Sequence, residues 1–456
     1  MKKLLVVNVV GLTRELLPHT PRLAAIGQTG FGATMTPPLP AVTTTSQATM
    51  LTGTPPSQHG IVANGWYFRE LGETWLWRQS NHLVEGSRVW RAARARFGSD
   101  FTVAKLFWWY NMYADVDWSV TPRPVYPADG RKIPSIYSEP PDLRGSLQGE
   151  LGRFPLFNFW GPTADLKSSA WIAAATQKII DRHAPSLVLC YLPHLDYDLQ
   201  RHGPHGPEAK RAAAEIDRVA GDLIDHARGQ GYEIIVLSEY GIEPVDHGIH
   251  INRALREAGL LRADKVDTGW ELLDGGASDA FAVADHQVAH VYVRDPAKVS
   301  RVKALLEGLD GVERVLDEDG KKAARLNHPR AGELVAIARP GRWFTYYYWQ
   351  DDALKPDFAR TVDIHRKPGY DPVELFADPK IKALKLKIGW TLLKKIMGFR
   401  YYMDVIPLDD TLVKGSHGRL PSSPEQGPLL MSTQKVGAVD HLDMTGVHDL
   451  ILASMA

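Results

Sequence analysis

Hydroxyl side chains crowd one short stretch of the chain, AVTTTSQATMLTGTPPSQHGIVAN, over residues 41 to 64. Three threonines and a serine stand in a row at positions 43 to 46, and turns are indicated at Gly53 and Gly60. Such residues are common helix caps. A threonine hydroxyl is also a nucleophile once a base or a metal ion takes its proton. The row of hydroxyls on its own leaves both roles open.

Two apolar runs elsewhere in the chain end in polar residues. SLVLCYLPHLD, residues 186 to 196, ends at Asp196, and YEIIVLSEYG, residues 232 to 241, contains Glu239 and Tyr240. Ligands of mainly parallel sheets lie beyond the carboxyl ends of the strands. The three residues are therefore site candidates by position, and a carboxylate beside a threonine hydroxyl can act as its general base.

The spacing around the hydroxyl row is more specific than any of its parts. After P-x-x-T, at Pro40 and Thr43, it reads T-x-L-T-G-x-x-P-x-x-H-G-I-x-x-N and ends at Asn64. This pattern resembles the nucleophile region of the alkaline phosphatase superfamily, in its nucleotide pyrophosphatase/phosphodiesterase branch, which includes phosphonoacetate hydrolase. The resemblance implies that Thr43 attacks phosphorus and that Asn64 helps bind a phosphate oxygen. A capping role for the same threonine is compatible with it.

The resemblance also implies a metal centre, in which two zinc ions activate the threonine and stabilise charge on phosphorus. Thr43, Asp196 and His417 match the ligand positions of the family, and Glu239 stands where the family has aspartate. We therefore expect a divalent metal, zinc in preference to manganese or magnesium, as one or two ions.

Three further ligand positions of the family are altered. Val10 replaces an aspartate, and Gln200 and Tyr240 replace histidines. Glutamine is a weak oxygen ligand, so Gln200 stays only a candidate. The losses argue against a standard two-zinc centre, which leaves Glu239 as ligand or general base and makes Tyr240 a candidate for substrate contact.

Other residues are candidates to complete the site. Asp285 and His286 are candidate relocated ligands, although a lone Asp-His pair is more often structural. His365, Arg366 and Lys367 are candidates for binding an anionic substrate, and the alternative for them is surface charge in a loop.

Two stretches have a structural and a functional interpretation. The aromatic run WFTYYYW, residues 343 to 349, is either packing, which we favour, or a platform for a base or sugar. LKLKIGWTLLKKIMGFRYYM, residues 384 to 403, is typical of a basic amphipathic helix. We expect this helix to pack on the body with a solvated lysine face, and binding to a membrane surface is the alternative.

Composition narrows the class of protein. Lys plus Arg and Asp plus Glu number 53 each, so the overall charge gives no case for nucleic acid as a partner. The one cysteine, Cys190, excludes an intramolecular disulfide, and no apolar run reaches the roughly 20 residues of a spanning helix. We expect a cytoplasmic protein with no membrane insertion, and a homo-oligomer stays open.

The elements that must position these residues follow a βαβ pattern, in which short apolar runs alternate with helical stretches. The pattern predicts an α/β fold, with a large, mostly parallel sheet and helices on both faces. We predict a core over residues 1–261, an inserted smaller α+β cap over 262–405, and a return to the core over 406–456.

The function expected from the sequence is that of a metal-dependent phosphoric-ester hydrolase, similar to phosphodiesterases and nucleotide pyrophosphatases. It would act on a small phosphorylated metabolite through Thr43. The alternative is a catalytically altered or inactive relative that binds a small anionic ligand or a partner without hydrolysis.

Overall fold

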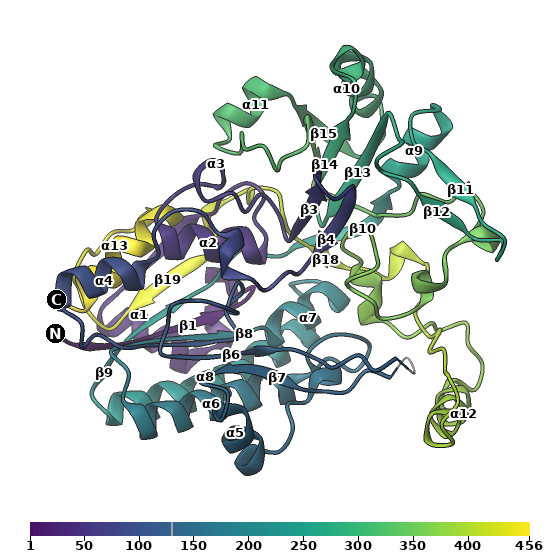
Figure 1. The fold of residues 1–456 in the computed structure, drawn as a ribbon. Coiled ribbons are helices and arrows are strands. Elements are labelled where there is room, and N and C mark those ends of the chain that lie inside the picture. The colour runs from purple at the N-terminus through teal and green to yellow at the C-terminus, as the bar shows by residue number, and fades with distance from the viewer. Residues whose placement is uncertain (129–130) are drawn as a thin grey trace.

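The apolar run near the start of the chain forms a buried strand, β1 (Lys3–Val9), in the middle of the largest sheet. The computed structural model describes residues 1–128 and 131–456 (Figure 1). The sheet has nine strands, in the order β20 (His441–Asp443), β2 (Phe31–Thr36), β19 (Leu429–Ser432), β9 (Tyr232–Leu237), β1, β8 (Leu187–Leu192), β5 (Val103–Leu106), β6 (Trp118–Pro122) and β7 (Ile136–Glu139).

The centre of this sheet is parallel. β1 pairs with β8 on one side and β9 on the other, and β8 continues in parallel to β5. β19 and β7 run antiparallel to their neighbours. The carboxyl ends of β1, β8 and β9 therefore meet at one edge, where the side chains that follow them can form a site.

Helices cover both faces of the sheet (Figure 1). α8 (Pro207–Gly229) turns a stripe of buried alanines, isoleucines and a leucine toward the sheet, at the spacing of an amphipathic helix. On its side of the sheet lie α1 (Pro21–Thr29) and α6 (Leu166–His183), with α5 (Leu143–Leu151) and α7 (His194–His202) next to them; the other side carries α2 (Thr43–Thr52), α4 (Val89–Phe97) and α13 (Val447–Ser454). The prediction of an α/β fold is confirmed.

A second hydrophobic core surrounds a four-stranded antiparallel sheet, in the order β13 (Ala280–Asp285), β14 (Val288–Val293), β16 (Leu334–Ala338) and β15 (Val312–Leu316). Its helices are α9 (Ile251–Glu257), α10 (Val299–Glu307) and α11 (Glu318–Ala323). Ile61, Val62 and Trp66 join the same core, so the segment that follows α2 packs against this sheet. The boundaries at residues 261 and 405 stay predictions.

The remaining elements are short. β17 (Gly341–Phe344), β10 (Glu243–Ile249) and β18 (Gly415–Ser416) form a three-stranded sheet. β3 (Gly65–Phe68) pairs with β4 (Glu73–Leu76), β11 (Ala263–Lys265) pairs with β12 (Glu271–Leu273), and α3 (Pro56–His59) precedes β3. The aromatic side chains Tyr346, Tyr347, Tyr348 and Trp349 are buried in the second core, which confirms packing as their role.

The basic helix forms as predicted, as α12 (Leu384–Ile396), but its packing differs from the expectation. Its apolar side chains lie on two opposite faces, and only one face can contact the body. Leu384 and Ile388 do so, whereas Leu386 and Trp390 are exposed. Among residues 1–128 and 131–456, no helix combines the length and apolarity that crossing a membrane requires.

Candidate active site

Thr43 is the first residue of α2 and is almost completely buried. The preceding Val42 is extended, and Gly53 ends the helix in the left-handed conformation. The N-cap residue is Val42, whose side chain makes no capping bond, so the hydroxyl row does not act as a cap, and the side-chain oxygen of Asn64 accepts from the Thr44 N–H in the first turn instead. The Thr43 hydroxyl instead lies 3.1 Å from the phenol oxygen of Tyr240. Helix N-termini carry partial positive charge, which favours an anion there.

Glu239 follows β9 and has no exposed surface. Its Oε1 accepts hydrogen bonds from the amides of Asn8 and Gln47, each at 2.5 Å, while Oε2 has no partner among the described residues. Burial raises the pKa of Glu239 to about 8, against the opposing effect of bonds from Gln47, Asn8 and Thr43. The carboxyl group is therefore neutral at pH 7 and becomes a base only above pH 8.

Tyr240 joins the threonine to a second carboxylate. Its phenol group donates to Oδ1 of Asp196 at 3.3 Å, so the Thr43 hydroxyl is left as the donor to Tyr240. Gln200, one turn further along α7, donates to Oδ2 of Asp196 at 2.8 Å. Burial raises the pKa of Asp196 to about 7, and these two bonds oppose the shift. A hydroxyl chain thus runs from the candidate nucleophile to a carboxyl group that titrates near neutrality.

Asn64 is held by Asp285 across the two cores. The backbone N–H of Asn64 donates to Oδ2 of Asp285 at 2.7 Å, and its amide donates to Oδ1 at 3.0 Å. Its own carbonyl oxygen accepts from the backbone N–H of Thr44. Burial raises the pKa of Asp285 to about 6. Both ends of the Asn64 side chain are therefore engaged within the protein, which fixes it beside the start of α2.

His286 and His417 are the last two candidate residues that lie in the site. His286 lies in the turn between β13 and β14, where its Nδ1 is 2.7 Å from Asp285, and its ring centroid is 3.7 Å from that of His417. His417 donates from Nδ1 to the carbonyl of Ala41, so its Nε2 keeps a lone pair, and that atom has no partner among the described residues. The His417 ring also stacks on Tyr240, with centroids 3.5 Å apart.

A glycine lets β18 approach closely enough to deliver His417. A Cβ atom at Gly415 would lie 2.2 Å from the carbonyl oxygen of Leu199. The backbone N–H of Lys414 donates to the carbonyl of Gln200 at 2.9 Å, and the carbonyl of His417 accepts from Gln287. The return of the chain to the core thus places this histidine against α7 and the second sheet.

Every predicted metal-ligand candidate lies in this one cluster, but not as a metal site. The set consists of Thr43, Asp196, Gln200, Glu239, Asp285, His286 and His417. Within the described part of the chain, no group of three His, Cys, Asp or Glu side chains is placed to hold an ion. The carboxylates accept from amide and phenol groups instead, and Val10, where the family has a ligand, is an apolar core residue. These donors do not fit a two-zinc centre.

The predicted substrate-binding loop contributes differently from the expectation. Lys367 is buried between Asp371 and Glu374, at 2.7 Å from each. Arg366 is exposed and pairs with Asp357, and the side chain of His365 is exposed as well. A substrate role for these three stays a prediction that no contact among the described residues supports.

Three residues of the site were not among the sequence candidates. Gln47 lies one turn after Thr43 on α2 and holds Glu239. Asn8, the last polar residue of β1, holds the same carboxylate. Tyr370 donates to Oε1 of Gln200 at 2.9 Å and stacks on His286. The i, i+4 spacing from Thr43 was a sequence signal that could have identified Gln47. No feature of the sequence pointed to Tyr370.

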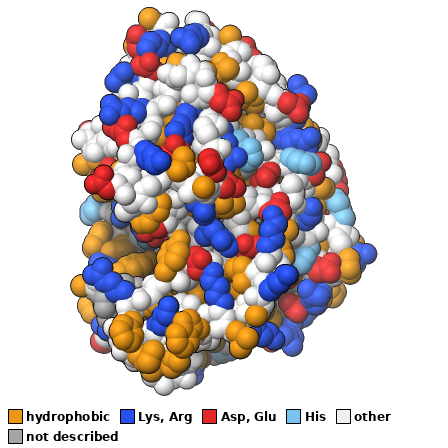
Figure 2. Space-filling model, turned by 90° about the vertical axis from the view of Figure 1, so that its right-hand side faces the viewer, with side chains coloured by type: hydrophobic (Ala, Val, Ile, Leu, Met, Phe, Trp, Pro, Cys, Tyr) orange, Lys and Arg blue, Asp and Glu red, His pale blue; other side chains and the backbone are white. Residues whose placement is uncertain are grey.

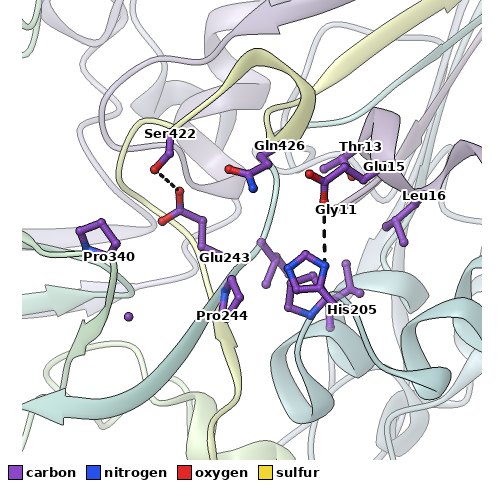
Figure 3. A pocket seen from close by; sticks show the side chains of 14 residues that line it. Gly11, Thr13, Glu15, Leu16, His205, Glu243, Pro244, Pro340, Ser422 and Gln426 are labelled. Atoms are coloured by element: carbon purple, nitrogen blue, oxygen red, sulfur yellow. Dashed lines mark hydrogen bonds and ion pairs between the residues drawn. The ribbon is translucent and has the colours of Figure 1, made fainter.

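A cavity of about 150 Å³ lies beside the carboxyl end of β1, where Gly11 and Ile242 line it (Figure 3). His205 points toward Glu15 at 3.9 Å, and Ser422 donates to Glu243. Its volume is below the roughly 300 Å³ at which ligand pockets usually begin. Thr43 does not line this cavity, so we do not assign substrate to it.

The sequence is similar to a protein-family model and to a curated protein. A family model described as "Type I phosphodiesterase / nucleotide pyrophosphatase" matches residues 4–371. An uncharacterized pyrophosphatase/phosphodiesterase of Schizosaccharomyces pombe is 23% identical over 252 residues, which are 53% of this chain and 44% of that protein. The chain thus spans less than half the length of this curated relative.

Solved structures share the fold at low sequence identity. Phosphonoacetate hydrolase from Sinorhizobium meliloti 1021, in complex with phosphonoformate, aligns with a TM-score of 0.63 at 16% identity, over 100% of this chain and 96% of the other. An inactive murine ectonucleotide pyrophosphatase/phosphodiesterase 5, in complex with AMP, aligns with a TM-score of 0.58 at 15% identity, over 100% and 95%. At these identities the likeness shows the fold alone.

Proposed function

The chain belongs to the type I phosphodiesterase / nucleotide pyrophosphatase family, and from this premise we propose that it hydrolyses phosphoric esters of a small phosphorylated metabolite with Thr43 as the nucleophile. The observation that carries the proposal is the position of Thr43. Its hydroxyl lies at the start of α2 and is linked through Tyr240 to Asp196, with Glu239 beside it. The ligands of the solved relatives, phosphonoformate and AMP, support a small substrate.

In the proposed reaction the Thr43 oxygen forms a bond to phosphorus as its O–H bond breaks. The leaving-group oxygen departs with the electron pair of the ester bond, and water later cleaves the phosphothreonine. Glu239 is the base that we propose for the threonine proton, because its Oε2 has no partner among the described residues and can accept the proton once the Thr43 hydroxyl turns away from Tyr240. A second route leads from Thr43 through the phenol group of Tyr240 to Asp196.

The negative charge that develops on phosphorus needs stabilisation. The positive end of α2 faces it, since a nucleophile at the first residue brings the phosphoryl group to the helix N-terminus. Asn64 is the proposed partner of a phosphoryl oxygen, and its amide would then share its donors between that oxygen and Asp285.

Members of this family generally depend on divalent metal ions. A divalent ion, with zinc as the favoured metal, stays a prediction for this chain. The free lone pair of His417 Nε2 and the unpartnered Oε2 of Glu239 support it. The amide and phenol bonds to the carboxylates speak against it, because those oxygens are already satisfied.

The same bonds favour a second candidate function, a relative that binds a small anion without cleaving it. A hydrogen-bonded network that holds every carboxylate in place gives a stable site with no ion to activate Thr43. Binding of AMP, measured by calorimetry in the absence of turnover, would support this candidate.

The test of the proposed function replaces the nucleophile. Thr43→Val keeps the shape of the side chain and removes its hydroxyl, and we expect hydrolysis of bis(p-nitrophenyl) phosphate to fall by at least about a hundredfold. The matched control is Thr45→Val on the same helix, because the Thr45 hydroxyl has no partner among the described residues. Turnover by the Thr43→Val variant at the rate of the control would exclude Thr43 as the nucleophile.

A further inference from the structure

α12 carries an apolar face that residues 1–128 and the rest of 131–456 leave exposed. Leu386, Trp390 and Leu393, at the i, i+4, i+7 spacing of one helix face, are 76%, 58% and 43% exposed. The opposite face is already in use, because Leu384 and Ile388 pack against a small buried cluster that includes Trp343. The outer face is therefore a surface of α12 beyond the one that holds it to the body.

The charge around this outer face has one sign. Residues 379 to 403 contain six lysines, one arginine and no acidic residue, in a chain whose formal net charge is zero. With 3.6 residues per turn, Lys385 and Lys394 lie on opposite edges of the outer face. The Lys394 ammonium also lies 5.7 Å from the ring centroid of Trp390. An apolar stripe edged by cations fits a partner that is apolar within and anionic at its surface.

α12 projects from the body, away from the nine-stranded sheet (Figure 1). On the side of the molecule where it lies, hydrophobic side chains gather with Lys and Arg side chains toward the lower end (Figure 2).

We propose that α12 binds the surface of an anionic lipid bilayer, with Leu386, Trp390 and Leu393 at the boundary of headgroups and acyl chains and the lysines at lipid phosphates. The 13-residue helix is too short to span a bilayer, so it lies in the interface. A second copy of this chain is a poor occupant, because the lysines of two such faces repel each other even with Lys387 paired to Asp404.

The experiment is co-sedimentation of the full chain with vesicles, either phosphatidylcholine alone or phosphatidylcholine with a third of phosphatidylglycerol. We expect binding to the anionic vesicles, weak binding to the neutral ones, and release at high salt. Leu386→Ser with Trp390→Ser should abolish binding, whereas Leu71→Ser, at another exposed leucine, should not change it. Thermal unfolding midpoints show whether each variant is folded.

Charge-reversal variants test the electrostatic part of the proposed lipid binding independently. Lys385→Glu with Lys394→Glu should lower the partition coefficient by more than about tenfold, because each basic residue near an anionic surface strengthens binding about fivefold. Lys210→Glu with Lys435→Glu changes the net charge equally at exposed positions outside α12 and should leave binding within about twofold of wild type. Equal losses in both pairs would overturn the proposal. So would absence of binding to anionic vesicles, or a lipid-free dimer that the serine variants dissociate.

Discussion

At the scale of single residues, hydrogen bonds hold the carboxyl groups of the site. Glu239 is held by two amides, and Asp285 by the backbone and side chain of Asn64. Amide donors stabilise a carboxylate less than a divalent cation would, so burial dominates and keeps the pKa of each carboxyl group raised. The protonation states of these carboxyl groups are therefore the most direct experimental signature of the site.

The stability of the chain should reflect the raised pKa of Glu239. Between pH 6.5 and 8 the folded chain keeps the Glu239 proton, while the unfolded chain, with a pKa of 4.5, has released it. The contribution of Glu239 to the free energy of unfolding therefore falls as pH rises, by up to about 1.4 kcal/mol per pH unit. Buried histidines with lowered pKa values contribute the opposite slope near pH 6.5, because they are partly protonated only in the unfolded chain, and their contribution fades toward pH 8.

Glu239→Gln isolates this contribution, because glutamine stays neutral and can still accept from Asn8 and Gln47. We expect the free energy of unfolding of wild type minus that of this variant, from urea unfolding at pH 6.5, 7 and 8, to fall as pH rises. Asp196, whose pKa lies at about 7, and the buried histidines contribute to both proteins and cancel in this difference. Parallel curves for the two proteins would show that Glu239 is ionised throughout.

Tyr240 decides between the two proposed proton routes. Tyr240→Phe keeps the ring on His417 and removes the link from Thr43 to Asp196. If Glu239 is the base, we expect kcat/KM to fall by about tenfold through poorer positioning of Thr43, with the rise near pH 8 retained. The measurement is kcat/KM from pH 6 to 9.

A larger loss in that experiment would favour the other route. If Asp196 receives the proton through Tyr240, the profile of wild type rises near pH 7, and the Phe variant loses about a hundredfold or more. Asp196→Asn serves as the comparison, since it should match Tyr240→Phe only in this second case.

Residue identities at the site were predictable where a motif carried them. The spacing that ends at Asn64 led to Thr43, and the polar ends of two strands led to Asp196, Glu239 and Tyr240. Gln47 and Tyr370 could not be found in this way, because their roles depend on side-chain bonds between segments far apart in the chain. The exposure of the outer face of α12 was missed for a similar reason, since an apolar pattern does not say which of two faces is covered.

At the scale of elements, α2 depends on how it ends as well as on how it begins. Gly53 ends the helix at φ +69°, a conformation that costs other residues about 1–2 kcal/mol. A Cβ atom there would also lie 3.0 Å from Cβ of His448, the second residue of α13. The glycine thus allows α2 and α13 to pack together on one face of the sheet.

Gly53→Ala should therefore destabilise the chain by about 1–2 kcal/mol from backbone strain alone, and by more if His448 cannot move. The matched control is Gly145→Ala in the first turn of α5, where no neighbouring atom lies within 4 Å of the new Cβ. This control should stabilise by about 0.5–1 kcal/mol through helix propensity. Denaturant midpoints measure both, and equal effects in the two variants would contradict the assigned role of Gly53.

At the scale of the whole molecule, the site lies where two hydrophobic cores meet. Thr43 and Asp196 lie on helices that pack on the nine-stranded sheet, and Glu239 follows one of its strands. Asp285 ends a strand of the second sheet, and His286 follows it. The βαβ alternation was sufficient to predict the first layer. The contact between the cores was not predictable, because it depends on backbone approaches such as that of Gly415 to α7 rather than on any periodic pattern.

This arrangement predicts how the whole fold responds to chelation. An ion that joined the two cores would support folding, and its removal would lower the unfolding midpoint. Here the bonds of Asp285 to Asn64, and of Asn64 to the backbone of Thr44, already link the second sheet to α2. The bonds of Glu239 to Asn8 and Gln47 hold elements of the first core together. We therefore expect dialysis against EDTA to shift the thermal midpoint by no more than about 2 °C.

Metal content per chain is measured on the same samples, for wild type and for Asp196→Ala with His417→Ala. It shows whether the chain binds no ion or binds an ion that its stability does not require. A drop of more than about 5 °C that zinc reverses only in wild type would instead show that the site closes around a metal ion.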